Sequence, residues 1–344
     1  MIDLRSDTVT LPSSKMKKFI MDSPLGDDVY GEDPSVNLLQ NKIAKIFNKE
    51  AALFVPSGTM ANLIAILTHC NRGDEVILGD KSHIFYYEAG GISAFGGIHS
   101  FQLKNNDDGT INLNDIETSI RAIGNNHFPK TKLICLENTH NICYGSPIDI
   151  DYFNQVRKIA DKYNLSIHLD GARIFNAAIA LNKPVDKLTK HCDTISCCLS
   201  KGLSAPVGSV ILGNKKFILK AKHMRKALGG GMRQAGLIAS AGIFSLDNMV
   251  ARIAVDHSNA KELASELNKI KKIEINPEKV YTNIIFIYNR HHKISNTKLS
   301  NELEKNNIKI DYKGNGKFRL VTHSGFKKND INFVVKVFKE ILKD

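Results

Sequence analysis

Lys201 and Asp170 are the two side chains whose types and positions most directly suggest catalysis. Lys201 comes just after a predicted buried strand at 194–199, and Asp170 comes just after another at 166–169. Ligands of open α/β sheets bind at the carboxyl ends of the strands, so both side chains are expected at one crevice. A partly buried lysine amine can form a Schiff base, and a carboxylate can keep a pyridine nitrogen protonated. Taken singly, the lysine could merely end its strand and the aspartate could cap a helix.

Three further segments point toward the same crevice. Ser57, Gly58 and Thr59 form a small-residue turn before a predicted helix, where free backbone N–H groups suit a phosphate. His83 follows another predicted strand, and its flat ring could stack on a cofactor. Arg173 carries a planar guanidinium that suits a carboxylate or a phenolic oxygen. Because an N-cap or an ordinary histidine uses the same residue types, the prediction of one site rests on the convergence of these signals.

The sheet that positions these residues is predicted from short apolar runs that alternate with amphipathic helices. Such alternation indicates an α/β fold with a mainly parallel sheet wrapped by helices. The pattern changes near residue 245, so we expect a large domain at 1–245, which includes the N-terminal segment, and a small C-terminal α/β domain at 246–344. The expected strands are 51–55, 75–78, 132–136, 166–169, 194–199, 208–212, an isolated strand at 283–288, and 319–322. The expected helices include 34–47, 60–68, 152–163, 299–306 and one that begins at 330.

The composition is that of a globular protein with a surplus of positive charge. The formal net charge is +12, but the lysines are spread along the chain in short runs without interleaved aromatics, so no nucleic-acid partner is expected. A basic scaffold that binds nucleic acid through surface lysines remains the alternative of a different class. The six cysteines include no C-x-x-C pair and are expected to be reduced and mostly buried. Since no signal-peptide pattern and no long apolar run occur, we expect a cytoplasmic protein without membrane contact.

Several longer stretches of the sequence match a known family, and some of them are eight residues long. The stretches are DLRSDTVT (3–10), DDVYGEDP (27–34), VPSGTMAN (55–62), GDKSHI (79–84), EAGG (88–91), ENTHN (137–141), LDGARIFN (169–176), LSKG (199–202), LGGGMRQ (228–234) and RLVTH (319–323). Almost from end to end, the chain resembles the low-specificity L-threonine aldolases. These enzymes belong to the fold-type-I pyridoxal-phosphate enzymes and to the broader group of β-eliminating lyases.

The resemblance implies pyridoxal 5′-phosphate as the cofactor and a role for each residue near it. Lys201 matches the Schiff-base lysine, and Asp170 matches the partner of the pyridine nitrogen. His83 matches the stacking histidine, and the turn at 57–59 matches the phosphate-binding turn. Arg173 matches an arginine near the cofactor oxygen and the substrate carboxylate. The implied reaction is the cleavage of L-threonine, L-allo-threonine and other β-hydroxy-α-amino acids to glycine and an aldehyde, with β-elimination or hydroxymethyl transfer as the open alternative.

Other matches concern the substrate and the arrangement of subunits. Ser6 and Arg319 match ligands of the substrate carboxylate. His127 matches a second histidine near the substrate hydroxyl, so either His127 or His83 is the candidate base. Arg233 matches an arginine that reaches a phosphate from a neighbouring subunit. Because family members are tetramers built from dimers, the resemblance implies a homotetramer with shared active sites and a small amino-acid substrate.

The sequence departs from the family pattern at three places. None of these departures removes a catalytic group. Tyr144-Gly145 stands where a Gly-Gly pair is usual, and Ser204 stands where a glycine is usual. The segment 324–326 replaces the usual acidic pair after Thr-His. Tyr144 and Ser204 are expected to alter the shape of the pocket, so substrate preference is the property that they affect.

Overall fold

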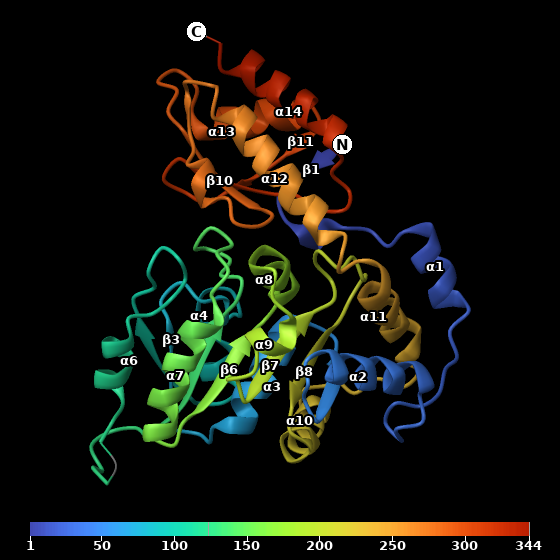
Figure 1. Ribbon diagram of the computed structural model, residues 1–344, viewed down its shortest axis with the longest axis vertical. Helices are drawn as coiled ribbons and strands as arrows, with labels where there is room; N and C mark the ends of the chain where they lie inside the picture. The colour runs from blue at the N-terminus through green and yellow to red at the C-terminus, as the bar shows by residue number, and fades with distance from the viewer. Residues whose placement is uncertain (123, 344) are drawn as a thin grey trace.

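A seven-stranded sheet forms the centre of the larger part of the protein (Figure 1). The computed structural model describes residues 1–122 and 124–343. The strands of this sheet are β2 Ala51–Val55, β3 Glu75–Gly79, β4 His99–Leu103, β5 Thr131–Glu137, β6 Ser166–Asp170, β7 Thr194–Cys198 and β8 Ser209–Gly213. Their order is β2-β8-β7-β6-β5-β3-β4, and only β8 is antiparallel to its neighbours. The predicted α/β fold with a mainly parallel sheet is confirmed, although the edge strand β4 was missed because its half-exposed residues form no apolar run.

Helices cover both faces of this sheet (Figure 1). In chain order they are η1 Asp7–Val9, α1 Ser14–Met21, α2 Pro34–Ile46, α3 Gly58–His69, α4 His83–Tyr86, α5 Gly91–Ala94, α6 Leu113–Ser119, α7 Ile150–Lys162, α8 Ile174–Leu181, α9 Val185–Leu188, α10 Lys215–Ala227 and α11 Gly236–Asn248. Helices α2, α7, α8 and α11 pack on one face, and α3 and α10 pack on the other. In β2, Ala52 and Phe54 face the first group while Leu53 and Val55 face the second. The strands therefore read as unbroken apolar runs, because successive side chains point to opposite faces that are both buried.

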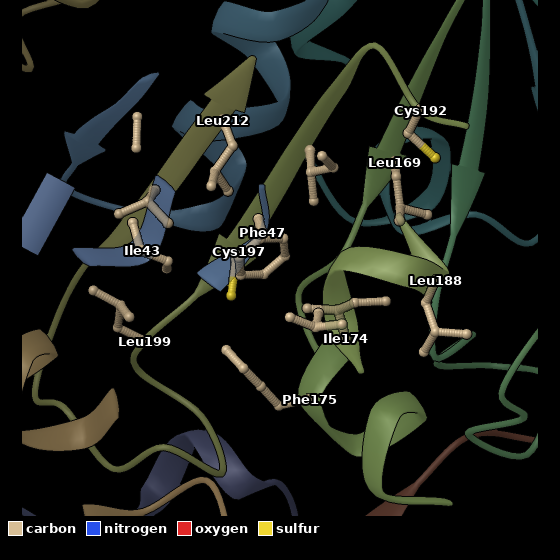
Figure 2. Packing of buried hydrophobic residues seen from close by; sticks show 14 of the residues in the cluster. Ile43, Phe47, Leu169, Ile174, Phe175, Leu188, Cys192, Cys197, Leu199 and Leu212 are labelled. Atoms are coloured by element: carbon tan, nitrogen blue, oxygen red, sulfur yellow. The ribbon is translucent and has the colours of Figure 1, made fainter. Parts of the chain in front are cut away.

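The core beneath the site is built from aromatic and branched side chains of α2, α8 and the central strands (Figure 2). The rings of Phe47 and Phe175 meet edge to face with their centroids 5.7 Å apart. Burial of one such ring contributes roughly 1.5–3 kcal/mol to folding. Cys197 and Leu199 belong to the same cluster and lie shortly before Lys201 in the chain. This packing fixes the end of β7 and hence the backbone that carries the lysine.

A second, smaller layer of helices and strands holds the C-terminal residues (Figure 1). Its elements are α12 Ile253–Leu267, β9 Ile273–Glu274, η2 Pro277–Lys279, β10 Ile284–Asn289, α13 Asn296–Lys305, β11 Ile308–Lys309, β12 Asp311–Tyr312, β13 Lys317–Val321 and α14 Lys328–Ile341. An antiparallel sheet of order β12-β13-β10-β9 faces these helices. The expectation that strand 283–288 is isolated was wrong, since β10 pairs with strands on both sides. Two strands of this sheet, β9 and β12, are only two residues long, too short to leave a period in the sequence.

The N-terminal residues connect the two parts of the molecule. Strand β1, Ile2–Asp3, pairs in parallel with β11, and Leu4 is buried in the C-terminal core. The chain then crosses to the large sheet, where the Thr10 hydroxyl donates to the Lys201 carbonyl (3.0 Å). Helix α12 begins in the large core at Ile253 and continues into the small one. The division at residue 245 stays a proposal.

Two further expectations from the sequence concern the burial of the cysteines and the absence of a membrane-spanning segment. All six cysteines are buried. Within the described residues no single helix has the length and apolar composition to cross a membrane, although the pair α11 and α12, bent by 71°, satisfies both when taken together.

Candidate active site

Asp170 lies at the carboxyl end of β6, and its carboxylate is buried and held by two close donors. Asn62 Nδ2 donates to Oδ2 (2.9 Å), and the Ala172 N–H donates to Oδ1 (3.0 Å). The Ser196 hydroxyl approaches Oδ1 at 3.5 Å. Burial alone would raise the pKa of Asp170, but the nearby charges of His83 and Lys201 and the Ala172 N–H outweigh it and lower the pKa. The carboxylate is therefore kept ionised where solvent hardly reaches it.

Asn62 joins Asp170 to a second buried carboxylate. Its amide also donates to Glu88 Oε1 (2.8 Å), and the same oxygen meets His83 Nδ1 at 2.9 Å. We call Asp170, Asn62, Glu88 and His83 the Asp170 network. Burial raises the pKa of Glu88, and the charge of Asp170 adds to that shift. Two neighbouring carboxylates thus have pKa values shifted in opposite directions, a pattern typical of active sites.

His83 begins helix α4 and is fixed at both its backbone and its ring. Its N–H donates to Glu137 Oε2 (2.7 Å), and its ring is about a quarter exposed. Burial opposes protonation, yet the hydrogen bond to Glu88 and the charge of Asp170 raise the pKa of His83. Ligand atoms of His83, Glu88 and Asp170 lie within 4.8 Å of one another, close enough for a cation. Asn62 and His83 already occupy these carboxylate oxygens, so we assign the cluster to a hydrogen-bonded network.

Lys201 follows β7 at the same edge of the sheet and is partly buried. Its charge acts on both Asp170 and Asp7 and lowers their pKa values. The Lys201 carbonyl accepts from Thr10, which ties this turn to the N-terminal segment. The structure thus brings the lysine, the buried aspartate and the histidine together, as the strand ends predicted.

The turn at Ser57 to Thr59 begins helix α3 and leaves backbone donors free. The Ser57 hydroxyl accepts from the Met60 N–H (3.2 Å), which makes Ser57 the N-cap. Among the described residues, the N–H groups of Gly58 and Thr59 have no acceptor. A Cβ at Gly58 would lie 2.6 Å from Cys198 Sγ, so only glycine fits this approach to β7. Free N–H groups at the start of a 12-residue helix suit a phosphate.

The three predicted carboxylate ligands meet where the N-terminal segment crosses the site. Arg173 forms a two-pronged pair with the buried Asp7, Nε to Oδ2 at 2.9 Å and Nη2 to Oδ1 at 2.7 Å. Ser6 directly precedes Asp7 and caps helix η1. Arg319 reaches the neighbouring Arg5 carbonyl through Nη2 (3.0 Å) and Asn141 Oδ1 through Nη1 (2.6 Å). Arg319 Nε is buried and has no partner among the described residues, so it remains available to a ligand.

Two predicted site residues lie outside this constellation. His127 is exposed in the loop before β5, whereas the other residues gather at the opposite, carboxyl end of that strand. Arg233 is half exposed and pairs with Asp27 (3.0 Å). Within one chain the structure does not bring either residue to Asp170.

Four polar residues of the site received no role from the sequence. Asn62 and Glu88 complete the Asp170 network, and Glu137 receives both the His83 N–H and the Asn141 N–H (2.8 Å). Asn141 in turn holds Arg319. All four lie inside the stretches that match the family, which is the signal that could have drawn attention to them.

The residues expected from the sequence to depart from the family pattern, Tyr144, Ser204 and Ser324, occupy strained or contacting positions. Tyr144 has φ +61° and Ser204 has φ +64°, a left-handed conformation in which glycine is favoured. The Tyr144 ring packs edge to face on Phe286 (5.4 Å). The Ser204 hydroxyl meets the Ser324 hydroxyl at 3.0 Å, so two of the departures contact each other.

Comparisons with known proteins agree with this geometry. A family model described as beta-eliminating lyase matches residues 3–290. A probable low-specificity L-threonine aldolase 2 of Arabidopsis thaliana is 45% identical over 343 residues, which cover 99% of this chain and 97% of the relative. The low specificity L-threonine aldolase of Escherichia coli (strain K12) is 43% identical and the match covers 94% of each chain. A solved threonine aldolase structure of Leishmania major has a TM-score of 0.83 at 20% identity over the full length of both chains, which shows the shared fold.

The family match includes Asp170, Lys201 and the whole Asp170 network, and the curated relatives extend over the C-terminal part with Arg319 as well. The chain belongs to the beta-eliminating lyase family and, within it, to the group of the low-specificity L-threonine aldolases.

Proposed function

We propose that the protein binds pyridoxal 5′-phosphate and cleaves the Cα–Cβ bond of L-threonine and related β-hydroxy-α-amino acids to glycine and an aldehyde. The observation that carries this proposal is the buried, ionised Asp170 at the strand end next to Lys201. The residues fit the cofactor: free N–H groups at Gly58 and Thr59 suit its phosphate, Asp170 suits its ring nitrogen, and Lys201 suits its aldehyde carbon. When bound, the cofactor supplies a sink for the electron pair of the broken bond.

The protein side chains hold the substrate and move its protons. Arg319 Nε, Ser6 and the free side of Arg173 would grip the α-carboxylate and so fix rotation about the bond to be broken. Asp170 would keep a proton on the ring nitrogen, since its own pKa is low. Glu88 holds His83 Nδ1, which leaves Nε2 as the atom that can accept the β-hydroxyl proton.

We also propose a cytoplasmic homotetramer in which His127 and Arg233 serve the site of a neighbouring subunit. Their exposure, together with their match to functional positions of the family, supports this arrangement. His127 would then be the alternative base to His83. Native mass spectrometry gives the subunit number, and loss of activity on dilution would follow from a shared site.

The decisive test combines an absorption spectrum with product detection. A visible absorption band of the purified protein, together with acetaldehyde from L-threonine and L-allo-threonine, would support cofactor and reaction together. A band without acetaldehyde would move the reaction to β-elimination or hydroxymethyl transfer. No band after addition of pyridoxal 5′-phosphate would refute the proposal.

A further inference from the structure

A cavity of about 260 Å³ lies between the two parts of the molecule, next to Arg319. Residues that follow β3 form one wall, including Lys81, and residues of the C-terminal sheet form the other, including Lys313 and Lys317. We call Lys81, Lys313, Lys317 and Arg319 with the space between them the basic cavity. Four cations and no carboxylate line it within the described chain.

Carboxylates around the basic cavity neutralise only part of its positive charge. Asp311 pairs with Lys313 (2.7 Å) and with Arg319 (3.0 Å). Asp107, whose charge acts on Lys317, is itself paired with Lys279 (2.7 Å). No carboxylate of the described residues lies within 4.0 Å of the ammonium group of Lys81 or Lys317. The cavity therefore carries surplus positive charge.

Lys317 is the member most clearly oriented for a ligand. Its ammonium lies 4.1 Å from the centroid of Phe286 and 5.1 Å from that of Tyr144, so aromatic rings hold it in place of a counter-ion. Burial lowers the pKa of Lys317, and the charge of Lys81 adds to that shift, which means that an anion in the cavity would be stabilised. The Tyr144 ring also packs edge to face on Phe286 (5.4 Å), so the two rings beneath Lys317 support each other.

Arg319 places the basic cavity relative to the proposed substrate. The residue is 7% exposed, its two terminal nitrogens are engaged, and its buried Nε lacks a partner among the described residues. This same arginine is our proposed ligand for the α-carboxylate, so the basic cavity adjoins the place where the substrate begins.

We propose that the basic cavity is a subsite for an anionic group on the β-substituent of the substrate, so that β-hydroxy-α-amino acids with a second carboxylate are favoured. This inference rests on the proposed function. With 3-hydroxyglutamate, the Cα–Cβ bond breaks, the β-hydroxyl proton leaves to a base, Cβ becomes the aldehyde carbon of 3-oxopropanoate, and Cα gains a proton to give glycine.

The test compares 3-hydroxyglutamate with 3-hydroxynorvaline, which has a methyl group in place of the second carboxylate. In the holoenzyme, kcat/KM should be about tenfold higher for the dicarboxylate, as expected for one charge-assisted hydrogen bond. Lys317→Gln should remove most of that ratio and Lys317→Arg should keep it. The control Lys336→Gln, at an exposed lysine of α14, should leave the ratio unchanged. A ratio near one, or a ratio that Lys317→Gln does not alter, would overturn the subsite.

A binding measurement separates this inference from the proposed reaction. By calorimetry, glutarate should bind the holoenzyme about tenfold more tightly than pentanoate, which has a methyl group in place of one carboxylate, and Lys317→Gln should abolish the difference. If threonine gives acetaldehyde but glutarate shows no advantage, the subsite is wrong and the aldolase proposal stands. If glutarate binds with the expected preference and no substrate is cleaved, the subsite stands and the reaction is wrong.

Discussion

The Asp170 network and the basic cavity lie on two sides of one site, and they differ in how far their polar groups are satisfied. In the network, Asp170, Glu88 and Asn62 are buried and each has hydrogen-bond partners at 2.8 or 2.9 Å. Among the described residues, the Lys317 ammonium lies over aromatic rings and has no paired carboxylate, and Arg319 Nε has no hydrogen-bond partner. A satisfied network fixes protonation states, whereas unsatisfied donors provide binding energy when a ligand arrives. We infer that chemistry resides in the network and selectivity in the cavity.

The largest effect is expected from breaking the network at its charged member. Asp170→Asn keeps the shape of the side chain but removes the charge that would hold a proton on the cofactor ring. Turnover should fall at least about a hundredfold, as for other fixed electrostatic groups of active sites. Steady-state kinetics measure the loss, and circular dichroism checks the fold. Asp22→Asn, at an exposed residue, is the control, and near-normal turnover of Asp170→Asn would rule out the assigned role.

Breaking the cavity side should affect binding more than turnover. Arg319→Gln removes the charge and the free Nε but leaves the Asp170 network intact. We expect KM for threonine to rise about tenfold or more, with a smaller change in kcat, because the carboxylate contact is made before and during the reaction. Arg290→Gln, at an exposed arginine paired with Glu274, is the matched control. A variant that lost kcat and kept KM would place Arg319 with the chemistry and remove the distinction between the two sides.

The pH dependence of kcat/KM tests whether His83 of the Asp170 network is the catalytic base. The pKa of His83 is raised, and a base must be unprotonated, so kcat/KM should increase with pH around a midpoint above the ordinary histidine value of about 6.5. Glu88→Gln removes a carboxylate that raises this pKa, so the midpoint should move to lower pH. Since the folded pKa of His83 is raised, the stabilisation contributed by protonated His83 is lost as pH rises from about 6.5 through the folded pKa.

The control for this profile is Glu278→Gln, at an exposed glutamate of η2. It should leave the midpoint where it is in the unchanged protein. A midpoint that Glu88→Gln also leaves in place would mean that His83 is not the titrating base. His127 of a neighbouring subunit would then take that role, and His127→Asn would become the informative variant.

The sequence indicated the main residues of the Asp170 network but not the basic cavity, and the difference has a physical reason. Asp170 and Lys201 follow apolar strands of a sheet buried on both faces, and such strands leave a local signal. Asn62 gave no comparable signal, because its role depends on how α3 crosses the sheet and sets its amide between two carboxylates. The basic cavity joins segments from opposite ends of the chain, and its strand β12 is two residues long. Contacts of that kind become visible only in the folded structure.

The smallest effect is expected where the two parts of the molecule touch, at Ser204 and Ser324. Ser204 has φ +64°, which costs about 1–2 kcal/mol for a residue other than glycine, while its bond to Ser324 returns about 1 kcal/mol. Ser204→Gly relieves the strain but loses the bond and gains the entropy cost of glycine, so the free energy of unfolding should change by less than about 1 kcal/mol. Ser324→Ala alone should destabilise by about 1 kcal/mol.

A double-mutant cycle decides whether this contact couples the two sides. If the hydroxyls bond as observed, Ser324→Ala should have little effect in the Ser204→Gly background, since its partner is already gone. Denaturant unfolding of the four proteins gives the coupling energy, and the ratio of 3-hydroxyglutamate to 3-hydroxynorvaline cleavage shows whether selectivity follows it. Additive effects on stability would mean that the contact does not hold the C-terminal part in place. Coupled stability with an unchanged substrate ratio would mean that the Ser204–Ser324 contact stabilises the fold without affecting substrate preference.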